Sequence, residues 1–187
     1  MDKIIVLDFG SQYSHLICRR IREFSVYAEL VPFDITVEEL TKMNPKGIIF
    51  SGGPASVYNS GAPIHENKIF EMKLPILGIC YGEQLMCQLL GGEVKAGFKQ
   101  EYGPAELIIK ESKDILEGVP SGITVWMSHG DEVVKAPQGF ETLAKTKTIP
   151  HAAIANKQKK IYGIQFHPEV VHTEFGEEIL ENFLALC

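Results

Sequence analysis

Short apolar runs alternate with helical patterns through the first half of the chain. Runs rich in Ile, Val and Leu lie at residues 3–8, 26–31, 47–51 and 74–79, with the length and β-branched content of buried strands. Each run is followed by residues with helical spacing of apolar positions, at 11–24, 36–43, 65–72 and 82–92. This alternation predicts a parallel sheet that is covered by helices on both faces.

After Gly92 the pattern changes to strand-like segments that are separated by turns. These segments lie at residues 105–110, 123–128, 141–146, 151–156 and 160–166, and a final helical pattern covers residues 173–186. The expected fold is therefore α/β, with an open, mixed, mostly parallel central sheet and helices on both faces. A chain of 187 residues without repeats or low-complexity linkers is expected to form one domain over residues 1–187.

Composition excludes several classes of partner. The chain has 18 Lys and Arg against 24 Asp and Glu, a net charge of −6, and so lacks the positive field that nucleic acid or anionic membranes require. No apolar run reaches the ~18 to 20 residues of a membrane span, and residues 1–10 do not resemble a signal peptide. We therefore expect a cytoplasmic protein with neither nucleic acid nor membrane as a partner.

A cysteine stands at a tight turn in "GICYGEQ", residues 78–84, between a strand pattern and a helical pattern. Ligands of open α/β sheets bind beyond the carboxyl ends of strands, where this turn is expected. The run from Gly78 to Gly82 has the form of the nucleophile elbow G-x-S-x-G, with a thiol in place of the hydroxyl. The helix N-terminus would favour the thiolate. A buried cysteine that happens to lie between glycines is the alternative, but the strand-to-helix context favours Cys80 as a nucleophile.

The other three cysteines, Cys18, Cys87 and Cys187, lie in helical patterns without a glycine turn, and we expect them to be packed, reduced thiols.

A cysteine nucleophile needs a base, and "FHPEV" offers His167 and Glu169 after the last apolar run. In extended chain, side chains two residues apart point the same way, so the carboxylate can orient one imidazole nitrogen while the other faces the thiol. Alone, this pattern is weak and favours a structural pair; its position at the end of a strand, with an elbow elsewhere in the chain, reverses that preference and predicts a base and its orienting group. The remaining histidines form no pattern of metal ligands, so no metal is expected.

A third loop, "SGGPAS" at residues 51–56, offers backbone rather than side chains. Its two glycines allow an amide N–H to approach a developing oxyanion closely. Phosphate binding is the alternative, but a Walker loop needs Gly-Lys-Ser/Thr, and the pyrophosphatase-type loop S-G-G-x-D-S needs an aspartate where this chain has Ala55. The loop is therefore a predicted oxyanion site.

Together, "SGGP", "GICYGEQ" and "QFHPEV" resemble the class I glutamine amidotransferases, whose fold is flavodoxin-like. The segments "DFGSQY", "EYGPAEL", "WMSHGDEV" and "FHPEVVHTEFGEEIL" are similar to the glutaminase part of the GMP synthases among them. The resemblance runs from Ile4 to Phe183. It implies Cys80 as nucleophile, His167 as base and acid, and Glu169 as orienting residue. It also implies oxyanion N–H groups from Gly53 and Tyr81, and substrate contacts from Gln84, Ser128, Gly130 and Asp131.

The resemblance further implies a reaction and a partner. L-Glutamine is hydrolysed to glutamate and ammonia through a cysteinyl thioester, and the ammonia passes to an ATP-pyrophosphatase subunit or domain of GMP synthase, which aminates XMP to GMP. ATP and Mg are expected on that synthetase partner, and no cofactor is expected in this chain. The S-G-G-x-D-S loop is absent from the 187 residues, so the chain is either a free-standing glutaminase subunit or a domain of a longer enzyme.

One residue departs from the family pattern, because Glu83 stands where the elbow more usually has Met. An inward carboxylate would disfavour the thiolate, so we expect Glu83 to point outward. His172 and Thr173 are candidates for contact with the partner, and Thr173 is equally a candidate cap for the last helix. Two alternatives remain for the whole chain: a free-standing γ-glutamyl or peptide cysteine hydrolase, and a catalytically silent regulatory subunit.

Overall fold

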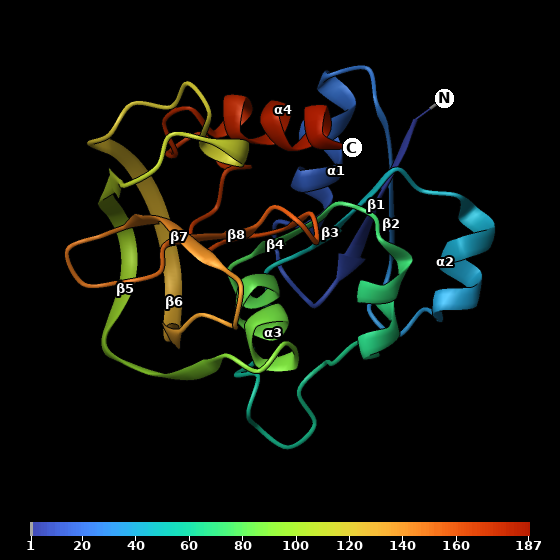
Figure 1. Cartoon of the computed structure of the whole chain (residues 1–187), viewed down its shortest axis with the longest axis horizontal. Helices are drawn as coiled ribbons and strands as arrows, with labels where there is room; N and C mark the ends of the chain where they lie inside the picture. Colours follow the sequence, from blue (N-terminus) through green and yellow to red (C-terminus); the bar gives the residue numbers. More distant parts are fainter. Residues whose placement is uncertain (1) are drawn as a thin grey trace.

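In the computed structural model, which describes residues 2–187 without the side chains of residues 98–100, nine strands form one sheet in the order β2-β1-β3-β4-β9-β8-β7-β5-β6 (Figure 1). The parallel part comprises β1 (Lys3–Asp8), β2 (Tyr27–Pro32), β3 (Gly47–Phe50), β4 (Ile76–Ile79) and β9 (Ile161–Ile164). The antiparallel part adds β5 (Glu93–Ile109), β6 (Ile123–Lys135), β7 (Glu141–Lys145) and β8 (Ala153–Asn156). The predicted mixed sheet is confirmed, and its parallel pairings lie in the half that carries the β-α units.

Helices cover both faces of this sheet. They are α1 (Ser14–Glu23), α2 (Val37–Met43), α3 (Tyr81–Leu89) and α4 (Gly176–Leu186), with short 3-10 turns η1 (Asn67–Met72) and η2 (Asp114–Leu116). Figure 1 shows α1 and α4 together on one face and α3 on the other. Along β1, Ile4 and Val6 join the core under α1 and α4, whereas Ile5 and Leu7 join the core under α3. The strand is apolar on both sides because both sides are covered.

The strands β5 and β6 form a much longer hairpin than the sequence predicts. The expected strands 105–110 and 123–128 are only its distal parts, and the pairing extends from Glu93 opposite Lys135 to Leu107 opposite Ile123, with a register shift between Ala96 and Glu101. The first half of β5 contains polar residues and glycines, so it has no apolar strand pattern in the sequence. It forms a strand because it pairs with β6, not because its side chains are buried. This pairing extends β6 through residues 128–131, which reach the site described below.

The last helix begins three residues later than expected. Its first residue is Gly176, preceded by Phe175 in the left-handed region at φ 57°. A Cβ at position 176 would lie 3.0 Å from the carbonyl carbon of Pro168, so the helix start packs directly against the loop that follows β9. This contact ties α4 to that loop.

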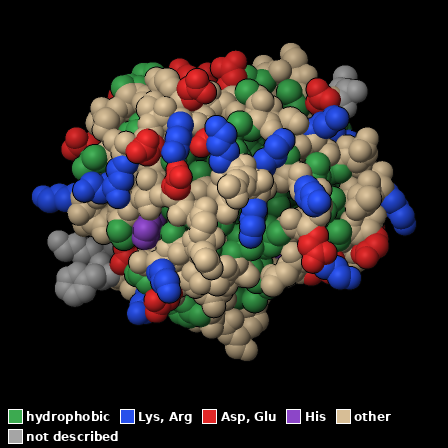
Figure 2. Space-filling model, in the orientation of Figure 1, with side chains coloured by type: hydrophobic (Ala, Val, Ile, Leu, Met, Phe, Trp, Pro, Cys, Tyr) green, Lys and Arg blue, Asp and Glu red, His purple; other side chains and the backbone are tan. Residues whose placement is uncertain are grey.

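The carboxyl ends of β1, β3, β4 and β9 lie along one edge of the sheet, as parallel pairing requires. The loops that follow these strands, at residues 9–13, 51–56, 80–84 and 165–169, therefore converge. Among the described residues, no helix combines the length and apolar content that crossing a membrane requires. On the face shown in Figure 2, Lys and Arg side chains are interspersed with Asp and Glu rather than gathered in one patch.

Candidate functional site

Cys80 stands at the sharp turn between β4 and α3, with φ 53° and ψ −107°. A residue other than glycine rarely adopts a positive φ, and it does so only where its surroundings enforce the strain. A Cβ at Gly78 would lie 2.6 Å from Gly82 C and from Glu83 N, and a Cβ at Gly82 would lie 2.6 Å from the Cβ of Phe50. Both glycines are needed for close packing, and the predicted elbow geometry is confirmed.

His167 and Glu169 form a buried pair in the loop after β9, in which the Nδ1 of His167 lies 2.8 Å from the Oε1 of Glu169. Three neighbours fix the backbone of this loop. The His167 N–H donates to Trp126 O at 3.0 Å, the Thr173 hydroxyl donates to His167 O at 2.6 Å, and the Arg20 Nε donates to Glu169 O at 3.0 Å. The pair is therefore held from β6, from the chain before α4 and from α1 at once.

Thr173 does not have either role that the sequence suggested. Its side chain is buried, donates to His167 O and accepts from the Trp126 N–H at 3.0 Å, so it is not available to a partner. It is not the helix cap either, because Phe175 occupies the N-cap position. His172 is exposed, and its ring stacks on that of Trp126 with centroids 4.6 Å apart.

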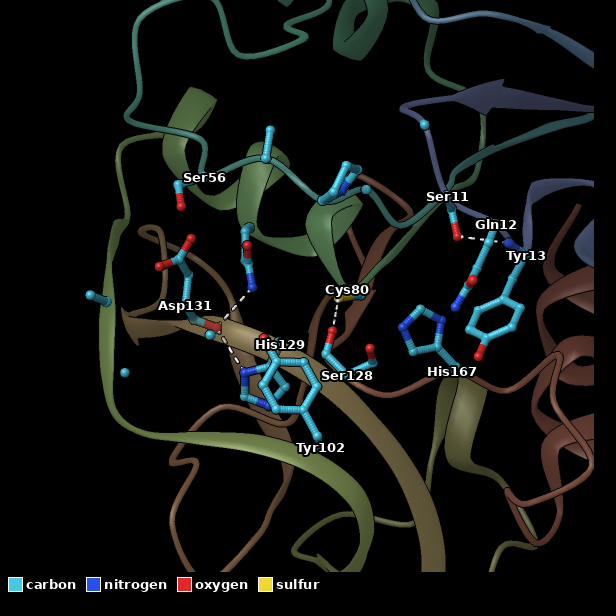
Figure 3. A pocket seen from close by; sticks show the side chains of 18 residues that line it. Ser11, Gln12, Tyr13, Ser56, Cys80, Tyr102, Ser128, His129, Asp131 and His167 are labelled. Atoms are coloured by element: carbon cyan, nitrogen blue, oxygen red, sulfur yellow. Dashed lines mark hydrogen bonds between the residues drawn. The ribbon is translucent and has the colours of Figure 1, made fainter.

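The imidazole of His167 lies between Cys80 and Tyr13 (Figure 3). Burial opposes protonation of the ring, but the Glu169 carboxylate and the Cys80 side chain outweigh burial and raise the pKa of His167 to about 10. The Tyr13 ring meets the imidazole edge-on, with centroids 5.3 Å apart and an interplanar angle of 70°. The imidazole is thus held as a cation through the neutral range.

The other three thiols have the packing role that the sequence predicts. Cys18 and Cys87 are buried and Cys187 is partly buried. Burial raises the pKa of Cys18, and it raises the pKa of Cys87 and of Cys187 to about 12. These thiols are protonated at neutral pH and lie away from the cavity that Cys80 lines.

A cavity of about 590 Å³ opens over Cys80 at the converging strand ends. It is large enough for an amino acid, and residues from six described segments of the chain surround it. Of the predicted site residues, the structure brings the following to its lining: Gly53, Cys80, Gln84, Ser128, Gly130, Asp131 and His167. Tyr81 is buried beside the cavity, with its hydroxyl donating to Pro63 O at 2.6 Å.

Hydrogen bonds join the elbow to β6 on one side of the cavity. The Cys80 thiol donates to Ser128 O at 3.6 Å, and the Nε2 of Gln84 donates to Asp131 O at 2.9 Å and to the Oε1 of Gln165 at 3.1 Å. Because both of its N–H groups are engaged, Gln84 has its carbonyl oxygen left for a ligand. The Asp131 carboxylate accepts from the Tyr58 hydroxyl at 2.7 Å, which links the loop after β3 to β6.

The two predicted oxyanion donors belong to Tyr81, which follows Cys80, and to Gly53, which lines the same cavity. The Tyr81 N–H belongs to the first residue of α3 and has no partner within the helix. Gly53 lies so close to β1 that a Cβ there would be 2.5 Å from Phe9 O. Ser51 fixes this approach, because its hydroxyl accepts from the Phe9 N–H and donates to Gly52 O, both at 2.9 Å.

Glu83 does not point outward. Its side chain is 0% exposed, and among the described residues neither carboxylate oxygen has a hydrogen-bond partner. Burial, and then the charge of Cys80, raise the pKa of Glu83 well above its usual range. The first turn of α3 packs directly on β9, where Gly163 leaves room for the side chain: a Cβ at 163 would lie 2.7 Å from the Cγ of Glu83.

Several cavity residues were missed at the sequence level. Ser11, Gln12 and Tyr13 follow β1, and the rule that directed attention to loops after strands applies equally to them. Tyr58, which contacts Asp131 from the loop after β3, and His129, which faces Glu101 of β5, had no local signal, because these contacts join segments far apart in the sequence. Among the described residues, no group of three or more His, Cys, Asp or Glu could hold a metal ion.

Known proteins resemble the chain over its whole length. The family model of class I glutamine amidotransferases matches residues 5–187. The glutamine-hydrolysing GMP synthase of Aquifex aeolicus is 58% identical over 181 residues, which are 97% of this chain and 36% of that protein. The corresponding protein of Listeria monocytogenes is 54% identical over 187 residues, which are 100% of this chain and 36% of that protein. The chain thus spans about a third of the length of these curated relatives.

Solved structures agree with the family match. A Thermoplasma acidophilum protein, described provisionally as one of the subunits of a GMP synthase, is 34% identical with a TM-score of 0.92, over 100% of this chain and 94% of that one. A glutamine amidotransferase from Thermotoga maritima is 18% identical with a TM-score of 0.70, over 90% of this chain and 76% of that one, a likeness that concerns the fold alone. The expected fold is confirmed.

Proposed function

Because the chain belongs to the class I glutamine amidotransferase family, we propose that it hydrolyses L-glutamine to glutamate and ammonia through a thioester on Cys80. The observation that carries this proposal is the position of Cys80: a strained elbow places its thiol beside the buried pair of His167 and Glu169, in a cavity of about 590 Å³. A nucleophile, a base and an orienting carboxylate in this arrangement are the requirements of acyl transfer.

The first step transfers the acyl group to sulfur. With the proton of the Cys80–His167 pair on the imidazole, the Cys80 thiolate attacks the side-chain amide carbon of glutamine, so that a C–S bond forms and the carbonyl oxygen becomes an oxyanion. The N–H groups of Gly53 and Tyr81 are the proposed donors to that oxyanion. The tetrahedral intermediate collapses as His167 protonates the leaving nitrogen, the C–N bond breaks, and ammonia departs.

The second step returns the enzyme to its starting state. His167, now neutral, takes a proton from a water molecule that attacks the thioester carbonyl, and the C–S bond breaks to release glutamate and the Cys80 thiolate. Glu169 holds the Nδ1 of the imidazole at 2.8 Å through both steps, so that the other nitrogen stays directed to the reacting atoms. The raised pKa of His167, about 10, suits a group that must hold a proton beside the thiolate.

Glutamine is proposed to lie along the side of the cavity that Gln84 and β6 form. The free carbonyl oxygen of Gln84 can accept from the substrate, and the backbone of Ser128, Gly130 and Asp131 provides further polar groups. The ring of His167 stands on the opposite side of Cys80 from Asp131 (Figure 3), which suits a substrate whose amino-acid end lies towards β6 and whose amide lies at the thiol.

The ammonia is proposed to pass to a synthetase module. The relatives from Aquifex aeolicus and Listeria monocytogenes are glutamine-hydrolysing GMP synthases, and this chain matches 36% of each. A module of the kind that makes up the rest of such proteins, with ATP and Mg bound to it, would use the ammonia to aminate XMP to GMP. The chain would then act in the cytoplasm as the glutaminase component of a GMP synthase.

An assay of the chain with L-glutamine tests the reaction directly. We expect equimolar glutamate and ammonia, loss of both with Cys80→Ala, and retention of both with the matched control Cys87→Ala, whose thiol lies outside the cavity. Adding the synthetase module, ATP and XMP should convert the ammonia into GMP. Cleavage of γ-glutamyl peptides in preference to glutamine would instead support the hydrolase alternative, and full activity of Cys80→Ala would overturn the proposal.

A further inference from the structure

A second histidine lines the same cavity, and the steps proposed above do not use it. His129 lies on β6 between Ser128 and Gly130, and its side chain is only 2% exposed. Figure 3 shows its ring below Asp131, on the far side of Ser128 from His167. Buried polar atoms are normally hydrogen-bonded, so each ring nitrogen of this buried imidazole should have a partner.

One nitrogen of His129 is accounted for by the backbone. Its Nδ1 lies 2.9 Å from Asp131 O, which can only accept, so Nδ1 carries a hydrogen. The same carbonyl oxygen accepts from the Nε2 of Gln84 at 2.9 Å. Asp131 O is thus held by two donors, one from β6 itself and one from α3, and the backbone of β6 at Gly130 is fixed between them.

The other nitrogen faces a carboxylate. Glu101 is directly opposite His129 in the β5–β6 pairing, and its Oε2 lies 3.4 Å from the His129 Nε2. Among the residues whose side chains are described, neither atom has a hydrogen-bond partner, while the other Glu101 oxygen accepts from the Thr148 hydroxyl. With Nδ1 protonated, a neutral ring presents a lone pair at Nε2, and an ionised carboxylate also presents only lone pairs. The two atoms attract each other only when a proton lies between them.

Three ionisable groups determine whether that proton is present. Burial lowers the pKa of His129, the Asp131 carbonyl and the Glu101 carboxylate oppose this, and the charge of His167 lowers the pKa of His129 further. The carboxylate of Asp131 is directed to Tyr58. The pair from β5 and β6 is thus expected to gain its proton as the pH falls below neutrality and to lose it as the pH rises.

We propose that His129 is a positioning residue for glutamine, and that a proton shared with Glu101 locks its ring so that it holds the backbone from Ser128 to Asp131 in the binding geometry. With the proton in place, Nε2–H donates to Glu101 and Nδ1–H stays on Asp131 O. Without it, the facing lone pairs push the ring and the carboxylate apart and loosen the hold on Asp131 O. Glutamine therefore binds more tightly at mildly acidic pH than at alkaline pH. This inference rests on the proposed function, since it concerns the same substrate.

Substitutions by asparagine and glutamine test the roles of the two ring nitrogens of His129 separately. In His129→Asn the amide N–H can replace Nδ1–H as the donor to Asp131 O, whereas in His129→Gln the amide reaches towards Glu101 and leaves Asp131 O without that donor. In Glu101→Gln the amide N–H can donate to the lone pair of a neutral His129 Nε2, so no shared proton is needed. If the His129 side chain only filled space, these variants would not differ in this way.

Equilibrium binding of L-glutamine by calorimetry, in the Cys80→Ala background to prevent turnover, tests the proposal. From about pH 5 to about pH 9, we expect the dissociation constant of the otherwise unchanged protein to rise by up to about tenfold, the effect of one pKa unit of linkage. Adding Glu101→Gln or His129→Asn should keep the dissociation constant near its low value at both pH values. Adding His129→Gln should raise it about tenfold at both. Glu178→Gln, an exposed charge change on α4, is the matched control and should follow the unchanged protein.

The outcomes separate this inference from the proposed function. A dissociation constant that does not change with pH, or that is equal in His129→Asn and His129→Gln, would overturn the inference while leaving the glutaminase proposal in place. Absence of glutamine binding in every variant, together with absence of ammonia release by the chain with its native Cys80, would overturn both. As a readout independent of binding, NMR of ¹⁵N-labelled imidazoles should show His129 with hydrogen on Nδ1 near neutral pH, and Glu101→Gln should move its titration to lower pH.

Discussion

Gly52 packs against His167 so closely that a Cβ at position 52 would lie 3.1 Å from the Cε1 of the imidazole. The same Cβ would lie 3.7 Å from the Cβ of Cys80. Position 52 therefore borders the space in which the thiol and the imidazole meet, and the absence of a side chain there keeps that space open. The glycine pair of the loop after β3 has a steric role at Gly52 that is separate from any role of the Gly53 N–H.

Gly52→Ala should impair catalysis without unfolding the protein. The contact between the added methyl group and the imidazole would be shorter than nine in ten natural Cβ contacts. The imidazole must therefore shift by a few tenths of an ångström away from its position beside Cys80. Because a misplacement of about 1 Å can cost about 100-fold in rate, a shift of a few tenths of an ångström should lower kcat/KM by about tenfold. Steady-state glutaminase kinetics measure the loss, and an unchanged midpoint of thermal unfolding serves as the control. Full activity in this variant would show that the imidazole does not need its present position.

A chloroketone analogue of glutamine should label Cys80 and spare Cys18, Cys87 and Cys187. Burial raises the pKa of Cys87 and of Cys187 to about 12, so neither presents a thiolate at neutral pH, and only Cys80 lines the cavity. Peptide mass spectrometry after partial labelling identifies the site. Cys80→Ala should abolish labelling and Cys87→Ala should preserve it, and comparable labelling of all four thiols would exclude a selective nucleophile at Cys80.

Replacing Glu169 should destabilise the fold in a pH-dependent way. His167 has a pKa raised to about 10 in the folded protein, against an ordinary value of 6.5, so its protonation contributes stability that is complete below about pH 6.5 and is lost as the pH rises through about 10. Because Glu169 is the main attractive charge, Glu169→Gln should reduce the free energy of unfolding most at about pH 6 and least at about pH 10. Urea denaturation at several pH values between these limits measures the difference, and a difference independent of pH would contradict it.

The sequence was sufficient for the features that depend on neighbouring residues. The elbow at Cys80 and the pairing of His167 with Glu169 follow from spacings of two residues and from position after a strand. Features set by distant residues could not be read in this way. The inward direction of Glu83 depends on the space that Gly163 leaves on β9, and the burial of Thr173 depends on its bonds to Trp126 and His167.

The same distinction applies to the strands. The parallel strands β1 and β3 are buried on both faces and appear as continuous apolar runs, so their place in the sheet was predictable. The first half of β5 is a strand only because β6 pairs with it, and the contact of Glu101 with His129 exists only in that pairing. The spacing of apolar residues does not indicate which strand a segment will pair with.

Glu83→Gln should stabilise the protein, and more so at higher pH. A carboxyl group that is buried without partners stays protonated in the folded state, while in the unfolded chain it ionises above about pH 4.5. Its folded pKa is raised, so the stability that it contributes is present below the unfolded value and is lost as the pH rises, by about 1.4 kcal/mol per pH unit. The stability gained from the neutral amide should therefore be larger at pH 7 than at pH 5.

Thermal and urea unfolding between about pH 5 and pH 8 measure this effect. Glu178→Gln, which removes an exposed carboxylate from α4, should change stability little and without a comparable pH dependence. If the stability difference between Glu83→Gln and the unchanged protein stayed constant over this range, Glu83 would have to be ionised in the folded protein.

The central claim is that Cys80 carries the acyl group of glutamine, and trapping that intermediate tests it most directly. The chain is mixed with L-glutamine, quenched in acid at short times, and digested for mass spectrometry of the peptide that contains residue 80. We predict a γ-glutamyl thioester on Cys80 that forms before glutamate accumulates, forms more slowly with Glu169→Gln, and is absent with Cys80→Ala. Steady release of ammonia and glutamate without any adduct on Cys80, or with the adduct on another residue, would contradict the account.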